Sequence, residues 1–204
     1  MMRYRIYLII MLMVLSPIVL CADGRNERVK WGVEWGAQMP AFNSLKCAYL
    51  AEDGYLVEYS KRKFRTHTNG SLSAFIGYDI RRNVNLSLYG GYTGLDMNAR
   101  GVGVSVRASG YFKEHSLGSY SKLFGEAGIS IERKKPLSHF YRIGYGYRLM
   151  LSDLVSLDLN CGIQTSFTHP KFYDSVSRKY LYYNEMEYLR NLCVGVFATV
   201  AFVF

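Results

Sequence analysis

The residues that could do chemistry are few, and most of them fall in expected loops. The chain of 204 residues has four histidines, His67, His115, His139 and His169. All but His115 fall toward one end of the predicted fold, where they could ligate a metal or act as the base of an acyl-transfer site. The nearest acid and hydroxyl partners are Ser71, Asp96 and Ser138. Because no spacing among these residues is diagnostic, we expect no enzyme activity, no metal site and no cofactor.

Cysteine chemistry is not expected either. Beyond Cys21, the chain contains Cys47, Cys161 and Cys193, an odd number at spacings that fit no zinc or redox motif. The strand pattern places Cys161 and Cys193 on opposite faces, so we predict no structural disulfide.

The elements that hold these residues are strands, because apolar and polar residues alternate from Val29 onward. From Val155 to Phe167 every odd position is apolar or Thr, and every even position is small or polar. Successive side chains of a strand point to opposite faces, so this pattern predicts a two-faced strand. With 15% aromatic and 20% charged residues, and one long apolar run at the N-terminus, the chain is neither disordered nor a polytopic helical membrane protein.

Eight segments alternate in this way, and they predict an all-β fold, an eight-stranded antiparallel up-and-down transmembrane β-barrel over residues 23–204. Their length suits tilted membrane strands. The long links Pro40–Ser71 and Thr168–Arg190 lie at one rim, as in outer-membrane barrels. Within the first link, Asp53-Gly54 predicts a hairpin above the rim; if its arms joined the wall, the barrel would have ten strands. The predicted strands are 29–39, 72–80, 84–94, 102–112, 123–132, 140–151, 155–167 and 191–204.

Charge indicates which face of the barrel meets lipid. The apolar faces of the eight segments contain no Lys, Arg, Asp or Glu. The opposite faces carry small and polar residues with a few charges of both signs, which suits a narrow interior where an unpaired charge is costly. We therefore predict a lumen filled by paired side chains. The predicted lumen charges are Lys30, Glu34, Asp79, Arg107, Glu126, Glu132, Arg142, Arg148 and Asp158.

The N-terminal segment has the layout of a secretory signal peptide. Arg3 and Arg5 precede the apolar run Ile6–Leu20, which is short for a membrane-spanning helix. We expect cleavage after Ala22, so that residues 1–22 are the signal peptide. The alternatives are a lipoprotein whose first mature residue is Cys21 and an uncleaved anchor helix.

The last strand carries a family resemblance. Phe202 and Phe204 close an alternating segment, and other aromatic residues gather toward both rims, as they do at membrane interfaces. A terminal Phe on such a strand resembles the assembly signal of Gram-negative outer-membrane barrels. Residues 23–204 resemble the small eight-stranded group that includes the transmembrane domain of outer-membrane protein A, and also the PorT-related barrel domains. The resemblance implies a location in the cell outer membrane and insertion by the barrel-assembly machinery.

The external loops predict contact with the cell surface. Clustered cations there would attract the phosphates and carboxylates of lipopolysaccharide. Tyrosines in Lys171–Tyr188 suit contact with an envelope or surface protein. We expect a monomer with a structural, surface-contact or envelope-complex accessory role and no nucleic-acid partner; the alternatives are a small pore or transport accessory, and an enzyme such as a lipid acyltransferase. The basic loop residues are Lys61, Arg62, Lys63, Arg65, Arg133, Lys134 and Lys135.

Overall fold

The computed structural model describes residues 28–204 except 52, 65–66, 97–98, 115–118, 133–135, 153, 175–178 and 182–184. The predicted signal peptide, residues 1–22, lies outside the described residues, and so do Arg65, Arg133, Lys134 and Lys135. Among the residues that are described, no helix has the length and apolarity needed to cross a membrane.

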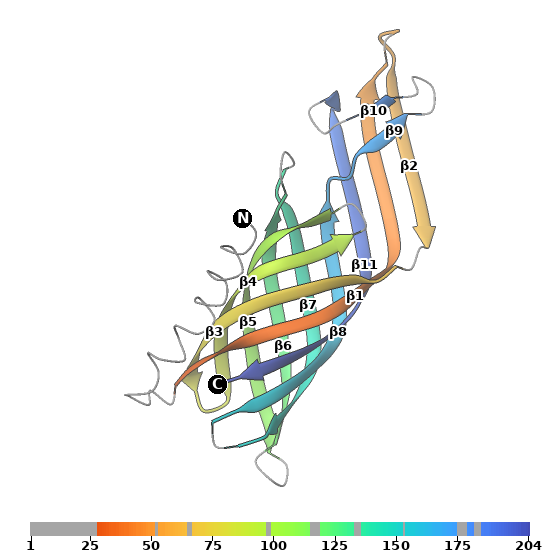
Figure 1. Ribbon diagram of the computed structural model, residues 1–204. Helices are drawn as coiled ribbons and strands as arrows, with labels where there is room; N and C mark the ends of the chain where they lie inside the picture. Colours follow the sequence, from red (N-terminus) through yellow and green to blue (C-terminus); the bar gives the residue numbers. More distant parts are fainter. Residues whose placement is uncertain are drawn as a thin grey trace, which may run out of the picture.

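Strands dominate the described part of the chain, and eight of them close into an antiparallel barrel. Hydrogen-bonded neighbours follow the order β11-β8-β7-β6-β5-β4-β3-β1-β2, and a further pairing of β11 with β1 closes the ring and leaves β2 outside it. The predicted eight-stranded fold is therefore confirmed (Figure 1). The strands are β1 (Val29–Leu50), β2 (Leu56–Phe64), β3 (Asn69–Arg81), β4 (Val84–Asp96), β5 (Ala99–Glu114), β6 (Tyr120–Ile131), β7 (Ser138–Met150), β8 (Ser156–Thr168), β9 (Phe172–Asp174), β10 (Lys179–Leu181) and β11 (Tyr188–Val203).

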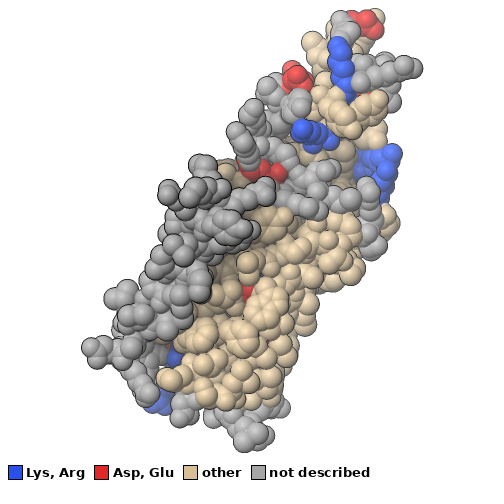
Figure 2. Space-filling view, in the orientation of Figure 1, with Lys and Arg blue, Asp and Glu red and all other residues tan. Residues whose placement is uncertain are grey.

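The two faces of the barrel wall differ sharply in polarity. Large apolar side chains such as Ile76, Ile143 and Ile163 are exposed on the outer face. The intervening positions point inward and bury charged side chains, including Glu34 and Arg107. On the face seen in Figure 2, the described wall is largely free of charge, and Lys, Arg, Asp and Glu gather toward the two ends. A soluble barrel would enclose its apolar face, so this arrangement is that of a barrel surrounded by lipid.

Strand β1 is longer than predicted, because the wall strand and the first hairpin arm are one continuous element. Its lower half pairs with β3 up to Gln38, and its upper half pairs with β2 from Phe42. Between the halves, the register with β11 shifts at a β-bulge between Pro40 and Phe42. A bulge bends a strand and tolerates proline, which has no N–H to give to the ladder. Above this bend β1 and β11 rise past the rest of the wall (Figure 1).

We call the upper halves of β1 and β11, together with β2, β9 and β10, the external extension. The extension has a small hydrophobic core of its own, in which the Phe172 ring lies 4.8 Å from the Tyr59 ring. The turn from β1 to β2 places Gly54 at a φ of 79°, a conformation that glycine adopts without steric cost. In the second long link, Thr168–Arg190, the structure contains a two-stranded hairpin, β9–β10, whose side chains contribute to this core. The buried members of the core are Cys47, Tyr49, Phe172 and Leu189.

Candidate functional site

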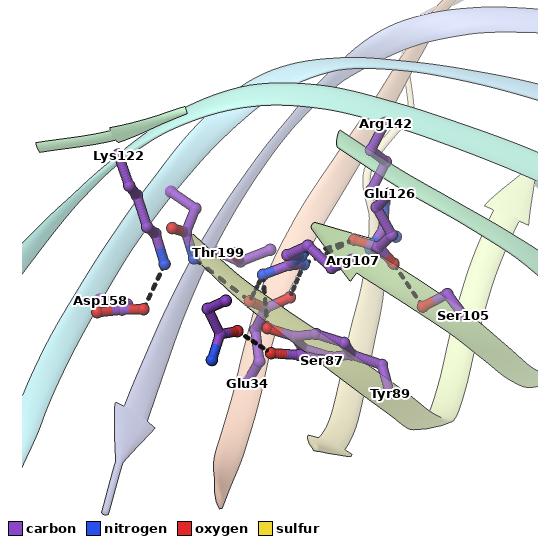
Figure 3. A network of polar contacts seen from close by, with 12 residues as sticks. Glu34, Ser87, Tyr89, Ser105, Arg107, Lys122, Glu126, Arg142, Asp158 and Thr199 are labelled. Atoms are coloured by element: carbon purple, nitrogen blue, oxygen red, sulfur yellow. Dashed lines mark hydrogen bonds and ion pairs between the residues drawn. The ribbon is translucent and has the colours of Figure 1, made fainter. Parts of the chain in front are cut away.

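The largest group of buried ion pairs in the described structure lies inside the barrel (Figure 3). Glu34 on β1, Arg107 on β5, Glu126 on β6 and Arg142 on β7 point toward one another there, and we call these four residues the central cluster. Nη1 of Arg142 lies 3.3 Å from Oε1 of Glu126, and Nε of Arg142 donates to Oε1 of Gln164 at 2.7 Å. Two guanidiniums and two carboxylates balance in charge, which limits the cost of removing them from water.

Arg107 joins the two carboxylates, and each of its five N–H donors has an acceptor. Two of the donors bond Glu34, from Nη1 at 2.6 Å and from Nη2 at 2.8 Å. Two more reach Oε2 of Glu126, from Nε at 3.0 Å and from Nη2 at 2.7 Å, and the last reaches the Tyr89 hydroxyl at 2.8 Å. The guanidinium also lies over the rings of Tyr89 and Phe124, at 4.1 and 4.6 Å from their centroids. Only a planar fork of donors could hold both acids in this way, so lysine would not replace Arg107.

A second group of charges, the lower cluster, lies nearer the rim with the short turns. Asp158 on β8 accepts hydrogen bonds from Nε of Arg148 at 2.6 Å and from Nη2 of Arg148 at 2.9 Å. It also forms an ion pair with Nζ of Lys122 (Figure 3). Toward the same rim, Asp79 accepts a hydrogen bond from Nδ2 of Asn85 at 2.7 Å. The lower cluster therefore joins β6, β7 and β8 through one carboxylate.

Lys122 belongs to this cluster, although it is not among the predicted lumen charges. The expected link between the fourth and fifth predicted strands extends as far as Lys122, whereas β6 already begins at Tyr120. The sequence contained a signal for this position, because Lys122 continues the alternate positions of Phe124 and Glu126, which face the lumen. Extending the alternation by one residue would have placed it correctly.

The structure brings six of the nine predicted lumen charges into these two clusters. Lys30 is half-buried near the start of β1, and Glu132 is buried just beyond the end of β6. Alternation in the sequence does not indicate which neutral residues complete the network. The hydrogen-bond partners that were not predicted are Tyr89, Ser105, Asn160 and Gln164.

Side chains fill the lumen around the central cluster. A Cβ atom added to Gly144 would lie 2.7 Å from the Phe124 ring, so the ring occupies the space that this glycine leaves. Beside Glu126 and Arg142, a hollow of about 20 Å³ remains. That volume holds about one water molecule.

The histidines and hydroxyls considered for acyl transfer do not form one site, although His139 and His169 lie close together. His139 is exposed while its neighbour Ser138 is buried, because they lie on opposite faces of β7. His67 shares a hydrogen bond of 3.1 Å with Asn69, and the side chain of Asp96 lies outside the described set. Burial, and then the nearby His139, lower the pKa of His169. Within the described ranges, no group of three or more His, Cys, Asp and Glu residues could hold a metal ion.

The described members of the basic loop set lie together on β2, at the outer edge of the extension. Lys61, Arg62 and Lys63 precede Phe64, the last residue of the strand. Phe64 is 86% exposed, and its ring packs against Phe42 at 5.4 Å. An exposed aromatic ring beside basic residues is typical of a membrane–water interface.

The C-terminal aromatics pack on β1 at the opposite end of the barrel. Phe204 stacks on Trp31 with 4.6 Å between ring centroids, and Phe202 lies 5.6 Å from Trp35. The backbone N–H of Phe204 donates to the carbonyl oxygen of Trp31 at 2.8 Å. These contacts continue the closing seam of the barrel, the pairing of β1 with β11, as far as Phe204.

Comparisons with known proteins return similar structures but no family. No family model and no curated protein match the chain. The N-terminal β-barrel domain of Pseudomonas aeruginosa OprF is 14% identical, with a TM-score of 0.40 over 85% of this chain and 97% of that one. Neisserial surface protein A is 12% identical, with a TM-score of 0.41 over 88% and 98%. The outer membrane protease OmpT from Escherichia coli is 9% identical, with a TM-score of 0.39 over 87% and 96%.

The class of this protein follows from its own geometry. The described strands form a closed ring with no free edge in the wall, an apolar outer surface and a polar, ion-paired interior. In lipid every backbone polar group must be bonded within the protein, and a closed barrel of strands achieves this. The chain is therefore a transmembrane β-barrel of the type found in the bacterial outer membrane.

Proposed function

We propose that this protein is a structural and surface-contact component of the outer membrane, in which the barrel anchors the external extension. The observation that carries this proposal is a contrast between the two halves of the molecule. Paired buried charges lie in the lumen, whereas the extension combines a packed core with exposed aromatic residues. A filled barrel serves as an anchor, and exposed aromatic side chains on a rigid element suit protein contact.

The lower end of β2 supports a second part of this role, contact with the outer leaflet. Lys61, Arg62 and Lys63 lie one to three residues from the exposed ring of Phe64. A ring at that position can enter the acyl region while the cations meet anionic headgroups of lipopolysaccharide. This contact would hold the extension upright on the membrane.

Site-specific photocrosslinking in intact cells tests the surface-contact role. A photoreactive amino acid replaces Tyr180, which is 62% exposed on the extension, or Ile143, which is 69% exposed on the lipid-facing wall. We expect a discrete protein adduct from position 180 and only lipid adducts from position 143. The proposed role would be contradicted if neither position gave a protein adduct. It would also be contradicted if both positions gave protein adducts in equal amounts.

A small pore is the second candidate, and the water-sized hollow beside Glu126 and Arg142 favours it. Ions that pass this level of the lumen would meet the central cluster, whose ion pairs would have to exchange partners. Planar-bilayer recording of the purified chain separates the two functions. Discrete conductance steps that change in Arg142→Gln would support the pore, and their absence would leave the anchoring role.

We also propose that residues 1–22 direct export and that the terminal aromatics Phe202 and Phe204 direct insertion by the barrel-assembly machinery. The apolar run after Arg3 and Arg5 supports the first proposal, and the stacking of Phe204 on Trp31 at the closing seam supports the second. The intact mass of protein extracted from membranes tests the first. We expect the mass of a chain that begins at residue 23. The mass of a lipid-modified chain that begins at Cys21 would contradict cleavage after Ala22.

A further inference from the structure

An unassigned groove lies on the outer face of the molecule, where the wall changes height. β7 begins at Ser138 and β8 ends at Thr168, whereas β11 continues upward to Tyr188. This step leaves a groove of about 470 Å³. That volume falls within the range of small-molecule sites in proteins.

Alternation along the three strands determines which side chains line the groove. His139 on β7 lies opposite Phe167 on β8, and Phe167 lies opposite Leu192 on β11. Arg190 and Tyr188 follow on the same face of β11, two and four residues above Leu192. The lining of the groove includes His139, Tyr141, Phe167, His169, Glu187, Tyr188 and Arg190.

The cationic member of this set is positioned for an anion. The Arg190 guanidinium lies over the Phe167 ring, 4.6 Å from its centroid. Among the described residues, Arg190 forms no ion pair with a carboxylate. Guanidinium forks bind phosphate oxygens in pairs, and the imidazole rings of His139 and His169 can donate further hydrogen bonds. Glu187 can accept hydrogen bonds from hydroxyl or amino groups beside a phosphate, and it would repel a bare anion.

The level of the groove in the membrane indicates an amphiphile rather than a free ion. Tyr141 and Tyr188 are half exposed, as expected for an aromatic girdle at the interface. Directly below, Ile143 on β7 pairs with Ile163 on β8, and both are exposed on the wall. A molecule seated here would place its polar group among the rings and its chains along these isoleucines.

We propose that this groove binds the phosphorylated sugar headgroup of an outer-leaflet glycolipid. The phosphate meets Arg190 and the two histidines, sugar hydroxyls or amines meet Glu187, and the acyl chains run down the wall past Ile143. The site deepens the proposed contact with lipopolysaccharide and rests on the outer-membrane placement. It is separate from the basic residues of β2, so the two contacts can succeed or fail independently.

Lipid binding to the purified full chain in detergent, measured by native mass spectrometry, tests the site. The probes are lipid A with two phosphates, the same lipid after removal of its phosphates, and phosphatidylethanolamine. We expect the unmodified chain to prefer phosphorylated lipid A. Arg190→Gln should weaken its binding by about tenfold, the loss expected when one charge-assisted contact is removed. Binding of dephosphorylated lipid A should not change.

Two matched variants remove the same charge elsewhere. Arg82→Gln lies in the short turn at the opposite rim and should bind lipid A like the unmodified chain, and Arg62→Gln reports on the β2 contact. Arg190→Lys retains the charge without the fork and should bind at an intermediate level. Unchanged binding in Arg190→Gln, or equal losses in Arg190→Gln and Arg82→Gln, would overturn the proposal. Equal binding of phosphatidylethanolamine and lipid A by the unmodified chain would also overturn it. A loss confined to Arg62→Gln would overturn the groove while supporting the contact at β2.

Discussion

Replacing Arg107 with methionine tests whether the central cluster holds the barrel together. Methionine retains most of the side-chain volume and removes the charge and all five N–H donors. Glu34 would then still accept a hydrogen bond from Nδ2 of Asn160, at 3.3 Å. Glu126 would keep the Ser105 hydroxyl at 2.6 Å and Arg142 at 3.3 Å. The substitution therefore leaves Glu34 as a buried carboxylate without a cation beside it.

The expected loss is large, because Arg107 is only 1% exposed. Removing one partner of a buried ion pair lowers the free energy of unfolding by about 3–5 kcal/mol, whereas an exposed pair contributes about 1 kcal/mol or less. We expect Arg107→Met to lie in the first range. Adding Glu34→Gln should restore about half or more of the loss, since the stranded carboxylate is then neutral.

Urea-induced unfolding in lipid vesicles, followed by tryptophan fluorescence, measures this effect. Both tryptophans, Trp31 and Trp35, lie on β1, and Trp31 stacks on Phe204 across the closing seam. Their emission therefore reports the opening of the barrel. A loss below about 1 kcal/mol for Arg107→Met would refute the assignment of the cluster as a buried support. A double variant no more stable than Arg107→Met would refute the role given to Glu34.

Three further predictions follow from the facing of the wall, the extension and the seam. Ile163→Arg should lower the free energy of unfolding of the barrel by about 2–4 kcal/mol, whereas Leu154→Arg in the short turn should lower it by about 1 kcal/mol or less. Equal losses, measured by unfolding in vesicles, would contradict the assigned lipid face. Burial raises the pKa of the Cys47 thiol, so less of it is thiolate at pH 8. With all other cysteines removed, maleimide should therefore label Cys47 more slowly than the exposed thiol of Tyr55→Cys, and the rate at Cys47 should rise with pH. Equal rates would show that the core of the extension is open. Phe204→Ala should slow assembly in cells, measured as the fraction of heat-modifiable barrel after a pulse, and unchanged assembly would exclude the stacked terminus as an insertion signal.

The clusters show why charge placement could be predicted more readily than pairing. Strand parity assigns Arg107 and Glu126 to the lumen, because a side chain has only two faces to choose from. Parity does not determine the stagger between strands that are distant in sequence. Glu34 and Arg107 meet at 2.6 Å, although 73 residues separate them and β3 and β4 lie between their strands. That contact requires ring closure, so no local pattern could reveal it.

The external extension shows which features follow from local sequence patterns and which depend on how distant strands pack together. Alternation and Asp53-Gly54 were enough to predict the strands, the polarity of the wall and a turn above the rim, because each depends on local geometry and on contact with lipid or water. The sequence did not reveal that β1 continues through a bulge at Pro40, or that the last long link packs on it. Nor did it show that Arg190 and His139 line one groove. These features arise when β11 pairs with β1 on one side and with β8 on the other, since these pairings set the relative heights of the strands.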